Sequence, residues 1–347
     1  MIKIGIAGLG FMGMIHYLAY QRLRGVKVVA MWELDPKRLA GDWRSIKGNF
    51  GPPGEMMDLS GIARYESMKD FLADEKVDMV DVCLPPSLHA KVTVAALKAG
   101  KHVFCEKPIA LKASDGARMV RAASAARKKL FIGHVLPFFP EFDFAYEAVT
   151  SKRYGRLLGG HFKRVISDPQ WLQGFYDPER VGGPMLDLHV HDAHFIRLLC
   201  GMPTGVSTVG RLRGEVAEYF NSQFRFRDPR LSVTATSGTI GQQGRGFLHG
   251  YEIHFERATL AFEFAMVGDE PRTLMPLTVF DRQGGATEPK LAGGDPVDCF
   301  VAELKHALAC LKNKKKSKIL DGSLARDALK ICQQQTKSLV AGRPVKI

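Results

Sequence analysis

The sequence predicts an α/β protein with a parallel sheet in its N-terminal part and a large, open, mostly antiparallel sheet in its C-terminal part. Up to about residue 133, short apolar runs alternate with helical segments at the spacing of β-α-β units. Beyond residue 150, apolar, β-branched and aromatic runs follow one another with few helices between them, as in antiparallel sheets. The length of 347 residues suits two domains, which we place at 1–133 and 134–347. The last two helices are expected to stay with the second domain or to pack back on the first.

The N-terminal part is expected to contain five strands and the helices that join them. Gly25 and Gly100 end two of these helices, and Gly100 lies at the position after the cap, where glycine is favoured. Ser87 is expected to cap one helix, and Ser114 or Asp115 the next. The expected strands are 3–7, 26–32, 78–84, 101–105 and 129–135, and the expected helices are 12–24, 87–98 and 114–127.

The C-terminal part is expected to consist mainly of strands. One helix interrupts them at 184–200 and ends at Gly201, and two amphipathic helices follow at 297–311 and 324–340. A further helix at 140–151 precedes the sheet. The expected strands are 156–166, 206–213, 219–226, 231–240, 251–255 and 274–280.

Composition excludes several classes of protein. With 46% hydrophobic and 24% charged residues, the chain is neither disordered, collagen-like nor a coiled coil. The net charge of +13 favours anionic partners, but the sequence shows no zinc-finger spacing, no RNA-binding aromatic pattern and no basic heptad helix. We therefore expect no nucleic-acid partner, and we expect the five lysines within 312–318 to form a solvated loop.

The cysteines and the N-terminal segment bear on the compartment. Six scattered cysteines without a C-x-x-C pair indicate reduced, buried thiols and a cytoplasmic protein. The uncharged run 4–21 resembles a signal peptide or membrane span in length, but four glycines interrupt it. We therefore expect neither secretion nor membrane association.

The first motif is Gly8-Leu9-Gly10-Phe11-Met12-Gly13, a G-x-G-x-x-G that follows a predicted strand and begins a helix. In this context Gly8 permits a tight turn, Gly10 lets a pyrophosphate approach the main chain, and Gly13 lets helix and strand pack closely. The helix N-terminus adds free N–H groups for phosphate. The segment from Gly8 to Gly13, including Phe11 and Met12, is therefore predicted to bind a dinucleotide.

Glu33 bears on which dinucleotide is bound. It ends the second strand, 20 residues after Gly13, where a carboxylate accepts hydrogen bonds from the adenosine ribose. Because this carboxylate would repel a 2′-phosphate, we expect the cofactor NAD. Lys37 and Arg38 lie close by, so NADP stays an alternative.

The second motif is Cys105-Glu106-Lys107-Pro108, at the end of a predicted strand. Ligands bind beyond the carboxyl ends of strands in open α/β sheets. The ammonium of Lys107, positioned by Glu106 and Pro108, can hold a substrate hydroxyl and stabilise the developing alkoxide. The alternative is an ordinary surface lysine.

A connection at the same sheet edge is expected to contact the nicotinamide half of the cofactor. It includes Leu84, Pro85, Pro86 and His89, in the run Leu-Pro-Pro-Ser-Leu-His. An ordinary proline-rich turn is the alternative interpretation.

The third motif runs from Gly182 to His191 and contains Asp187. Within one helix, Asp187 and His191 would stand at i and i+4 and share a face. A carboxylate beside an imidazole suits a general base that takes the proton of an alcohol. Two alternatives remain: core histidines, or a metal site of Asp187, His191 and His194 with His189 as a fourth ligand.

Aromatic residues are candidates for a substrate pocket, because aromatic faces suit the apolar faces of sugar rings. The candidates are His134, Trp171, Phe175 and Tyr176. Core packing is an equal alternative for each of them.

With these motifs in this order, the chain resembles the glucose–fructose oxidoreductase/inositol dehydrogenase (Gfo/Idh/MocA) family. The resemblance includes DMVDVCLPPSLHAKVTVAALKAGKHVFCEKPIAL and the ending ARDALKICQQQTKSLVAGRPVKI. It implies an N-terminal Rossmann domain and a C-terminal domain whose open sheet forms a homodimer or homotetramer. Lys107 matches the lysine of the family's E-K-P motif, and Asp187 and His191 match its aspartate and catalytic histidine. The Lys107–Pro108 bond is expected to be cis.

The resemblance implies an NAD(P)-dependent dehydrogenase acting on a hydroxyl carbon of a small sugar, polyol or cyclitol. Pro184 and His189 replace glycines of the family pattern, and His134 begins a segment where many relatives carry arginines, so the family's substrate contacts are not carried over. No metal is expected. The alternatives are NAD-assisted glycoside cleavage or epimerisation without net redox change, a non-catalytic sugar or dinucleotide sensor and, more distantly, a metal-dependent hydrolase.

Overall fold

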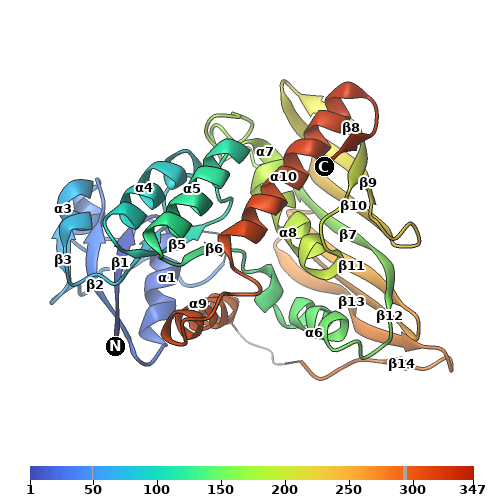
Figure 1. Cartoon of the computed structure of the whole chain (residues 1–347), viewed down its shortest axis with the longest axis horizontal. Helices are drawn as coiled ribbons and strands as arrows, with labels where there is room; N and C mark the ends of the chain where they lie inside the picture. Colours follow the sequence, from blue (N-terminus) through green and yellow to red (C-terminus); the bar gives the residue numbers. More distant parts are fainter. Residues whose placement is uncertain (49, 292–294) are drawn as a thin grey trace. The chain divides into compact units, whose positions relative to one another are not determined.

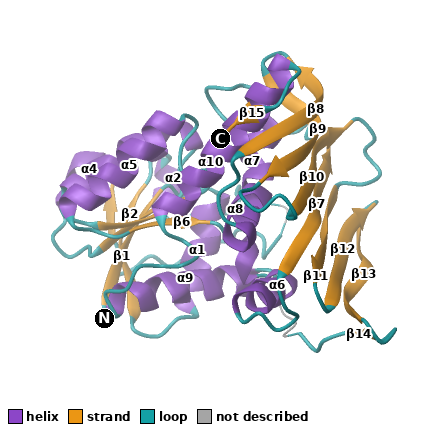
Figure 2. Cartoon of the chain, turned by 45° about the vertical axis from the view of Figure 1, so that its right-hand side comes forward, coloured by secondary structure: helices purple, strands orange, loops and turns teal. Residues whose placement is uncertain are grey.

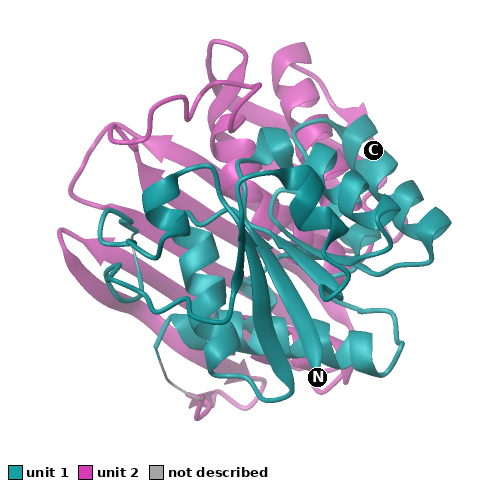
Figure 3. Cartoon of the chain, turned by 90° about the vertical axis from the view of Figure 1, so that its left-hand side faces the viewer, with its two compact units in different colours: residues 1–138, 293–326 teal, residues 139–292, 327–347 magenta. Residues whose placement is uncertain are grey.

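The computed structural model describes every residue except 49 and 292–294, and the chain divides into two compact units (Figure 3). Unit 1 consists of Met1–Phe138 and Gly293–Arg326, and unit 2 of Phe139–Ala292 and Asp327–Ile347. Each unit contains its own β-sheet, one parallel and one mostly antiparallel, which confirms the expected fold class. The sequence placed the first boundary at residue 133, whereas the units divide after Phe138.

The sheet of unit 1 contains, within the described residues, six parallel strands in the order β3-β2-β1-β4-β5-β6. The order reverses between β1 and β4. At such a reversal the carboxyl ends of the strands border a crevice in which α/β proteins bind ligands. The strands are β1 (Ile2–Ala7), β2 (Val26–Trp32), β3 (Ala63–Tyr65), β4 (Met79–Val82), β5 (His102–Glu106) and β6 (Leu130–Gly133).

Helices cover both faces of this sheet. Figure 1 shows α4 (Pro86–Lys98) and α5 (Ala113–Ala126) on one face, and α1 (Phe11–Gln21) and α9 (Val297–Lys312) on the other. The unit also contains α2 (Pro36–Leu39), α3 (Met68–Ala73) and a 3₁₀ turn, Leu136–Phe138. In the described part of the chain, no helix has the length and apolar character that a membrane span requires.

The sheet of unit 2 has, among the described residues, nine strands in the order β14-β13-β12-β11-β7-β10-β9-β8-β15. Among these described strands, only β7 and β10 pair in parallel, and the other neighbours are antiparallel. The strands are β7 (Leu157–Ser167), β8 (Gly205–Arg213), β9 (Val216–Arg225), β10 (Ser232–Ile240), β11 (Phe247–Phe255), β12 (Ala258–Val267), β13 (Glu270–Asp281), β14 (Ala286–Thr287) and β15 (Val345–Lys346).

The helices of unit 2 lie on one face of its sheet (Figure 2). They are α6 (Pro140–Thr150), α7 (Gly183–Asp187), α8 (His189–Cys200) and the part of α10 (Gly322–Ala341) that belongs to this unit. Buried aromatic rings attach α6 and α8 to the strands. Phe142 of α6 lies 5.2 Å from both Phe195 of α8 and Tyr251 of β11, measured between ring centroids. Edge-to-face pairs of this kind add to the stabilisation from apolar burial.

Three expectations about single elements are wrong. The helix expected at 184–200 is two helices, α7 and α8, because the chain leaves regular helical geometry at Leu188. Ser87 does not cap α4, which begins at Pro86, a residue suited to the first helical position because it lacks an N–H. Neither Ser114 nor Asp115 caps α5, whose N-cap is Lys112 without a side-chain bond.

Three described strands of unit 2, β12, β14 and β15, lie outside the expectation, and β12 is the longest of them. The sequence predicted a strand at 251–255 and none directly after it, but β12 follows β11 after a two-residue turn at Glu256 and Arg257. The expected strand is therefore half of a hairpin, and its partner supplies the next position in the sheet.

Candidate active site

The glycine-rich loop after β1 has the shape of a phosphate cradle. Gly8 has a φ of +93°, which favours glycine, and a Cβ at Gly13 would lie 2.1 Å from the carbonyl oxygen of Gly8. A Cβ at Gly10 would meet no atom of the described residues within 4 Å. Helix α1 begins at Phe11 with neither a side-chain cap nor an acidic residue in its first turn. These features fit the pyrophosphate of a dinucleotide.

Glu33 lies beside this cradle, as predicted. One carboxylate oxygen accepts a hydrogen bond from the N–H of Leu9 at 2.7 Å. The other oxygen accepts from the N–H groups of Leu34 and Asp35 at 2.6 and 3.0 Å. The carboxylate therefore joins the end of β2 to the glycine loop, where the ribose of a dinucleotide would lie.

The connection after β4 lies on the other side of β1. Pro85 is exposed and Leu84 is half-buried, but His89 is fully buried. Its ring nitrogens lie 2.8 Å from the carbonyl oxygen of Pro108 and 2.7 Å from that of Leu84. His89 thus links the connection after β4 to the segment after β5, and contact of either Leu84 or His89 with a cofactor stays a prediction.

The E-K-P segment follows β5, at the same edge of the sheet. Glu106 is 7% exposed, and one of its oxygens accepts a hydrogen bond from the N–H of Lys107 at 3.2 Å. Gly133, at the end of β6, leaves room for this carboxylate, because a Cβ there would lie 2.7 Å from Glu106 Oε1. The Lys107–Pro108 peptide bond is cis, as expected.

In unit 2, a double-glycine turn leads into the third motif. Gly182 and Gly183 have φ values of +81° and +65°, and the N–H of Gly183 donates to the carbonyl of Phe175. Asp187 ends α7 and His191 lies in the first turn of α8. Asp187 and His191 therefore belong to two helices. The expectation that they lie four residues apart on one face of a single helix is wrong. Both side chains are half-buried.

The two neighbouring histidines differ from His191 in burial. His189 and His194 are 0% exposed. The Nε2 of His189 contacts Gln335, which donates in turn to Ser222. Burial lowers the pKa of His189 to about 4, so the ring is neutral at neutral pH.

The alternative metal site is not assembled. Among the described residues, three ligand atoms from His, Cys, Asp or Glu lie within 4.8 Å of one another only at His16, Asp81 and Cys83. Asp187, His191 and His194 do not form such a group.

The expected substrate-pocket residues have different environments. Trp171 is 75% exposed, whereas Phe175 and His134 are buried. The hydroxyl of Tyr176 donates to Asp168 at 2.9 Å, and the guanidinium of Arg213 lies 4.1 Å from the centre of its ring. The contact of Arg213 with Tyr176 could not be predicted, because it joins β8 to the distant segment before α7 and no local sequence pattern marks it.

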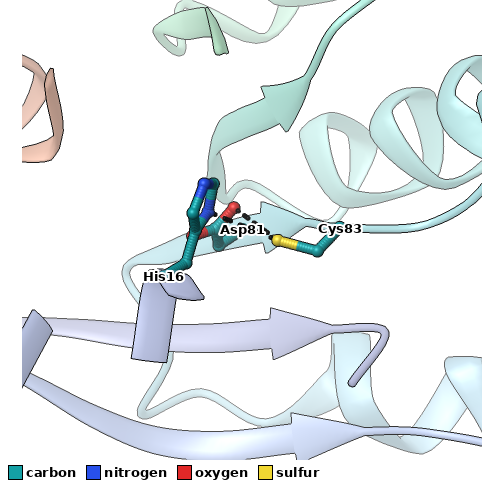
Figure 4. A group of neighbouring side chains, drawn as sticks. All are labelled: His16, Asp81 and Cys83. Carbon is teal, nitrogen blue, oxygen red and sulfur yellow. Dashed lines mark hydrogen bonds and ion pairs between the residues drawn. The ribbon is translucent and has the colours of Figure 1, made fainter. Parts of the chain in front are cut away.

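A buried polar cluster in unit 1 was also missed. His16 of α1 and Asp81 and Cys83 of the β4 segment lie together, and each of the three side chains contacts the other two (Figure 4). Asp81 was the visible sign of this cluster in the sequence, because it is a carboxylate inside an apolar strand. Its partner His16 lies 65 residues away and could not be identified from the sequence.

Comparisons with known proteins agree with this architecture. Residues 2–134 match the model of an oxidoreductase family with an NAD-binding Rossmann fold, and residues 142–261 match the GFO/IDH/MocA C-terminal domain. Among solved structures, levoglucosan dehydrogenase in complex with NADH and levoglucosan covers the whole chain with a TM-score of 0.80 at 18% identity. An NAD-binding oxidoreductase from Klebsiella pneumoniae reaches 0.84 at 19% identity, with 100% and 98% of the two chains covered. At these identities the likeness shows the fold.

Curated relatives match smaller parts of the chain. A 1,5-anhydro-D-fructose reductase from Ensifer adhaerens is 30% identical over 50% of this chain and 59% of its own length. A myo-inositol 2-dehydrogenase from Thermotoga maritima is 31% identical over 58% and 55%, respectively. A 2,7-anhydro-N-acetylneuraminate hydratase from Escherichia coli is 32% identical over 42% and 39%. The chain thus spans little more than half the length of the first two relatives.

Proposed function

Because the chain belongs to the Gfo/Idh/MocA family of oxidoreductases, we propose that it is an NAD-dependent dehydrogenase acting on a hydroxyl carbon of a sugar, polyol or cyclitol. One observation carries the proposal. The glycine cradle, Glu33 and Lys107 follow β1, β2 and β5 at the carboxyl edge of one parallel sheet, where an α/β protein binds a dinucleotide.

The proposed mechanism divides the work among three side chains. A bound nicotinamide supplies the site that accepts or donates the hydride. Lys107 donates a hydrogen bond to the substrate oxygen and stabilises its developing negative charge. His191 removes the hydroxyl proton, and Asp187 orients the imidazole. This requires Lys107 of unit 1 and His191 of unit 2 to face one substrate.

The names of the relatives support the substrate class. The compounds in these names, 1,5-anhydrofructose, myo-inositol and levoglucosan, all carry secondary hydroxyl groups on a six-membered ring. The aromatic side chains of Trp171 and Tyr176, together with His134, are proposed to contact such a ring. Small carbohydrate-like alcohols are therefore the substrates to test first.

A substrate panel tests the proposal. The purified protein is incubated with sugars, polyols, cyclitols and sugar acids, each with NAD and with NADP, and formation of reduced nicotinamide is followed by its absorbance. We expect turnover with at least one secondary alcohol and a lower KM for NAD than for NADP, because Glu33 repels a 2′-phosphate. Binding of NAD without turnover of any panel member would instead favour a sensor.

A second candidate function is NAD-assisted chemistry without net redox change. It is favoured by the relative named a hydratase, whose reaction name implies no net oxidation. In this case NAD would co-purify with the protein, and an anhydro-sugar or glycoside would be converted without accumulation of reduced nicotinamide. Product analysis by mass spectrometry distinguishes the two candidates.

A further inference from the structure

The buried cluster beneath the E-K-P segment joins two carboxylates through one imidazole. His16 and Asp81 are 0% exposed, and His16 Nδ1 lies 2.9 Å from Asp81 Oδ2 (Figure 4). Tyr20, one turn further along α1, donates its hydroxyl proton to the same oxygen at 2.9 Å. The thiol of Cys83 lies 3.4 Å from the other oxygen of Asp81 and 3.3 Å from His16 Nδ1. The position of Asp81 is thus fixed by three side chains.

The other side of the His16 ring faces Glu106. His16 Nε2 lies 3.1 Å from Glu106 Oε1. This distance is that of an ion pair, but the angle does not meet hydrogen-bond geometry. Among the described residues, neither atom has another hydrogen-bond partner. The second oxygen of Glu106 accepts the N–H of Lys107. A continuous path of contacts therefore runs from Asp81 through His16 and Glu106 to the main chain of Lys107.

The two contacts determine the charge of the ring. A neutral imidazole has one N–H, so either Nδ1 or Nε2 would turn a lone pair toward a carboxylate oxygen. Protonation of both nitrogens removes this repulsion and places a cation between two anions. Burial opposes the charge, but Cys83 and Asp81 outweigh it and hold the pKa of His16 well above its usual 6.5.

Glu303 of α9 completes the surroundings of the ring. Its side chain is 0% exposed, and neither carboxylate oxygen has a hydrogen-bond partner in the part of the chain that the structure describes. Burial and the neighbouring Glu106 raise the pKa of Glu303 well above 4.5, which favours the neutral form of this carboxyl group. The groups facing His16 are then the carboxylates of Asp81 and Glu106, the thiol of Cys83, the hydroxyl of Tyr20 and the carboxyl group of Glu303.

We propose that His16 is a positioning residue for the candidate active site: its imidazolium holds the carboxylate of Glu106, which in turn fixes the main chain of Lys107. The inference rests on the proposed function, because it assumes that Lys107 acts on substrate. It adds a role for a residue of α1 that touches neither substrate nor cofactor. Removal of His16 should leave the glycine cradle intact and displace the amine of Lys107.

Steady-state kinetics of His16→Gln test this role. We expect kcat to fall about tenfold to a hundredfold, as for a small misplacement of a catalytic group, while the Kd for NAD changes less than about threefold. Thr278→Val is the matched control, since it removes a buried hydroxyl group of β13 in unit 2 and should keep full activity. The same loss should appear in Glu106→Gln.

A double variant separates positioning from general destabilisation. In a Lys107→Ala background, His16→Gln should cause little further loss of kcat, because the group that it positions is already absent. Fully multiplicative losses of kcat in the double variant would overturn the inference.

A wild-type rate in the single variant His16→Gln would reject the inference and leave the proposed function standing. A wild-type protein that binds NAD but turns over no substrate rejects the proposed function, and with it the role of His16 in positioning a catalytic amine.

The charge of the His16 ring can also be measured in the wild-type protein, so this test does not depend on whether a variant folds. The ¹⁵N NMR spectrum of the His16 ring should show two protonated nitrogens above pH 6.5, the usual imidazole pKa. A neutral ring would overturn the inference. So would a stoichiometric metal ion in the purified protein, because His16, Asp81 and Cys83 also carry ligand atoms within 4.8 Å of one another.

Discussion

Single residues of the same type have opposite roles in this chain because their surroundings differ. His16 is buried between carboxylates and is expected to be charged. His189 is equally buried, but it faces the amide of Gln335 and its pKa falls to about 4. His191 is half-buried and is the only one of the three proposed to exchange a proton with substrate. Burial and charged neighbours, rather than residue type, decide among these roles.

His189 gives a prediction about stability and pH. Its pKa is about 4 in the folded chain and 6.5 when unfolded, so folding favours the neutral ring. Its contribution is complete above pH 6.5 and is lost as the pH falls towards 4, by up to about 3 kcal/mol. Urea unfolding should therefore show a weaker pH dependence in His189→Gln than in the wild type. The half-buried His254 of β11 provides the control; equal slopes for His189→Gln and His254→Gln would contradict the account.

His191 gives a prediction about catalysis. His191→Ala removes the proposed general base and should lower kcat by about 10²- to 10⁴-fold, with little change in the Kd for NAD. His194→Gln concerns a buried neighbour on the same helix and tests whether the effect is specific. An unchanged turnover in His191→Ala would end its assignment as the base.

At the scale of elements, two glycines in the turn between β1 and α1 are expected to affect different properties, one NAD binding and the other stability. Gly10→Ala places a methyl group in open space, so the melting temperature should change little. The same methyl group occupies the room proposed for pyrophosphate, so the Kd for NAD should rise at least about tenfold, a loss of roughly 1.4 kcal/mol.

Gly13→Ala is the matched contrast. Its methyl group would lie 2.1 Å from the carbonyl oxygen of Gly8, so α1 must move away from β1. We expect a clear drop in melting temperature, measured by circular dichroism. Equal effects of the two variants on both stability and NAD binding would show that the cradle is not where we place it.

Most elements could be predicted from local patterns, and the exceptions have physical causes. β1, α1 and the glycine loop follow from a short apolar run, glycine spacing and helix-forming residues, all local in sequence. The break at Leu188 could not be predicted, because no proline or glycine marks it. The contacts of Asp81 with His16 and of Tyr176 with Arg213 join distant segments, so the sequence showed the unusual residue but not its partner.

For the whole molecule, the sheet of unit 2 predicts self-association. Among the described residues, its helices lie on one face only, and large apolar side chains of β8 and β13 are exposed. Val209 is 65% exposed and Leu274 is 49% exposed. Exposed apolar area of this kind commonly marks an interface, and we expect a homodimer or homotetramer.

Light scattering coupled to gel filtration tests the assembly. The mass of Val209→Lys with Leu274→Lys should shift toward that of the 38.4 kDa monomer. Val340→Lys changes a similarly exposed residue of α10 and should leave the mass unchanged. A wild-type protein that is monomeric at high concentration would contradict the prediction.

The central claim is that Lys107 and His191 act on one substrate beside a nicotinamide. A crystal structure of the protein with NAD and a substrate found in the panel tests it most directly. We predict the Lys107 amine and the His191 imidazole each about 3 Å from the same substrate oxygen, with the pyrophosphate over Gly10. A structure in which the two side chains face different surfaces, or in which NAD binds away from the glycine loop, would contradict it.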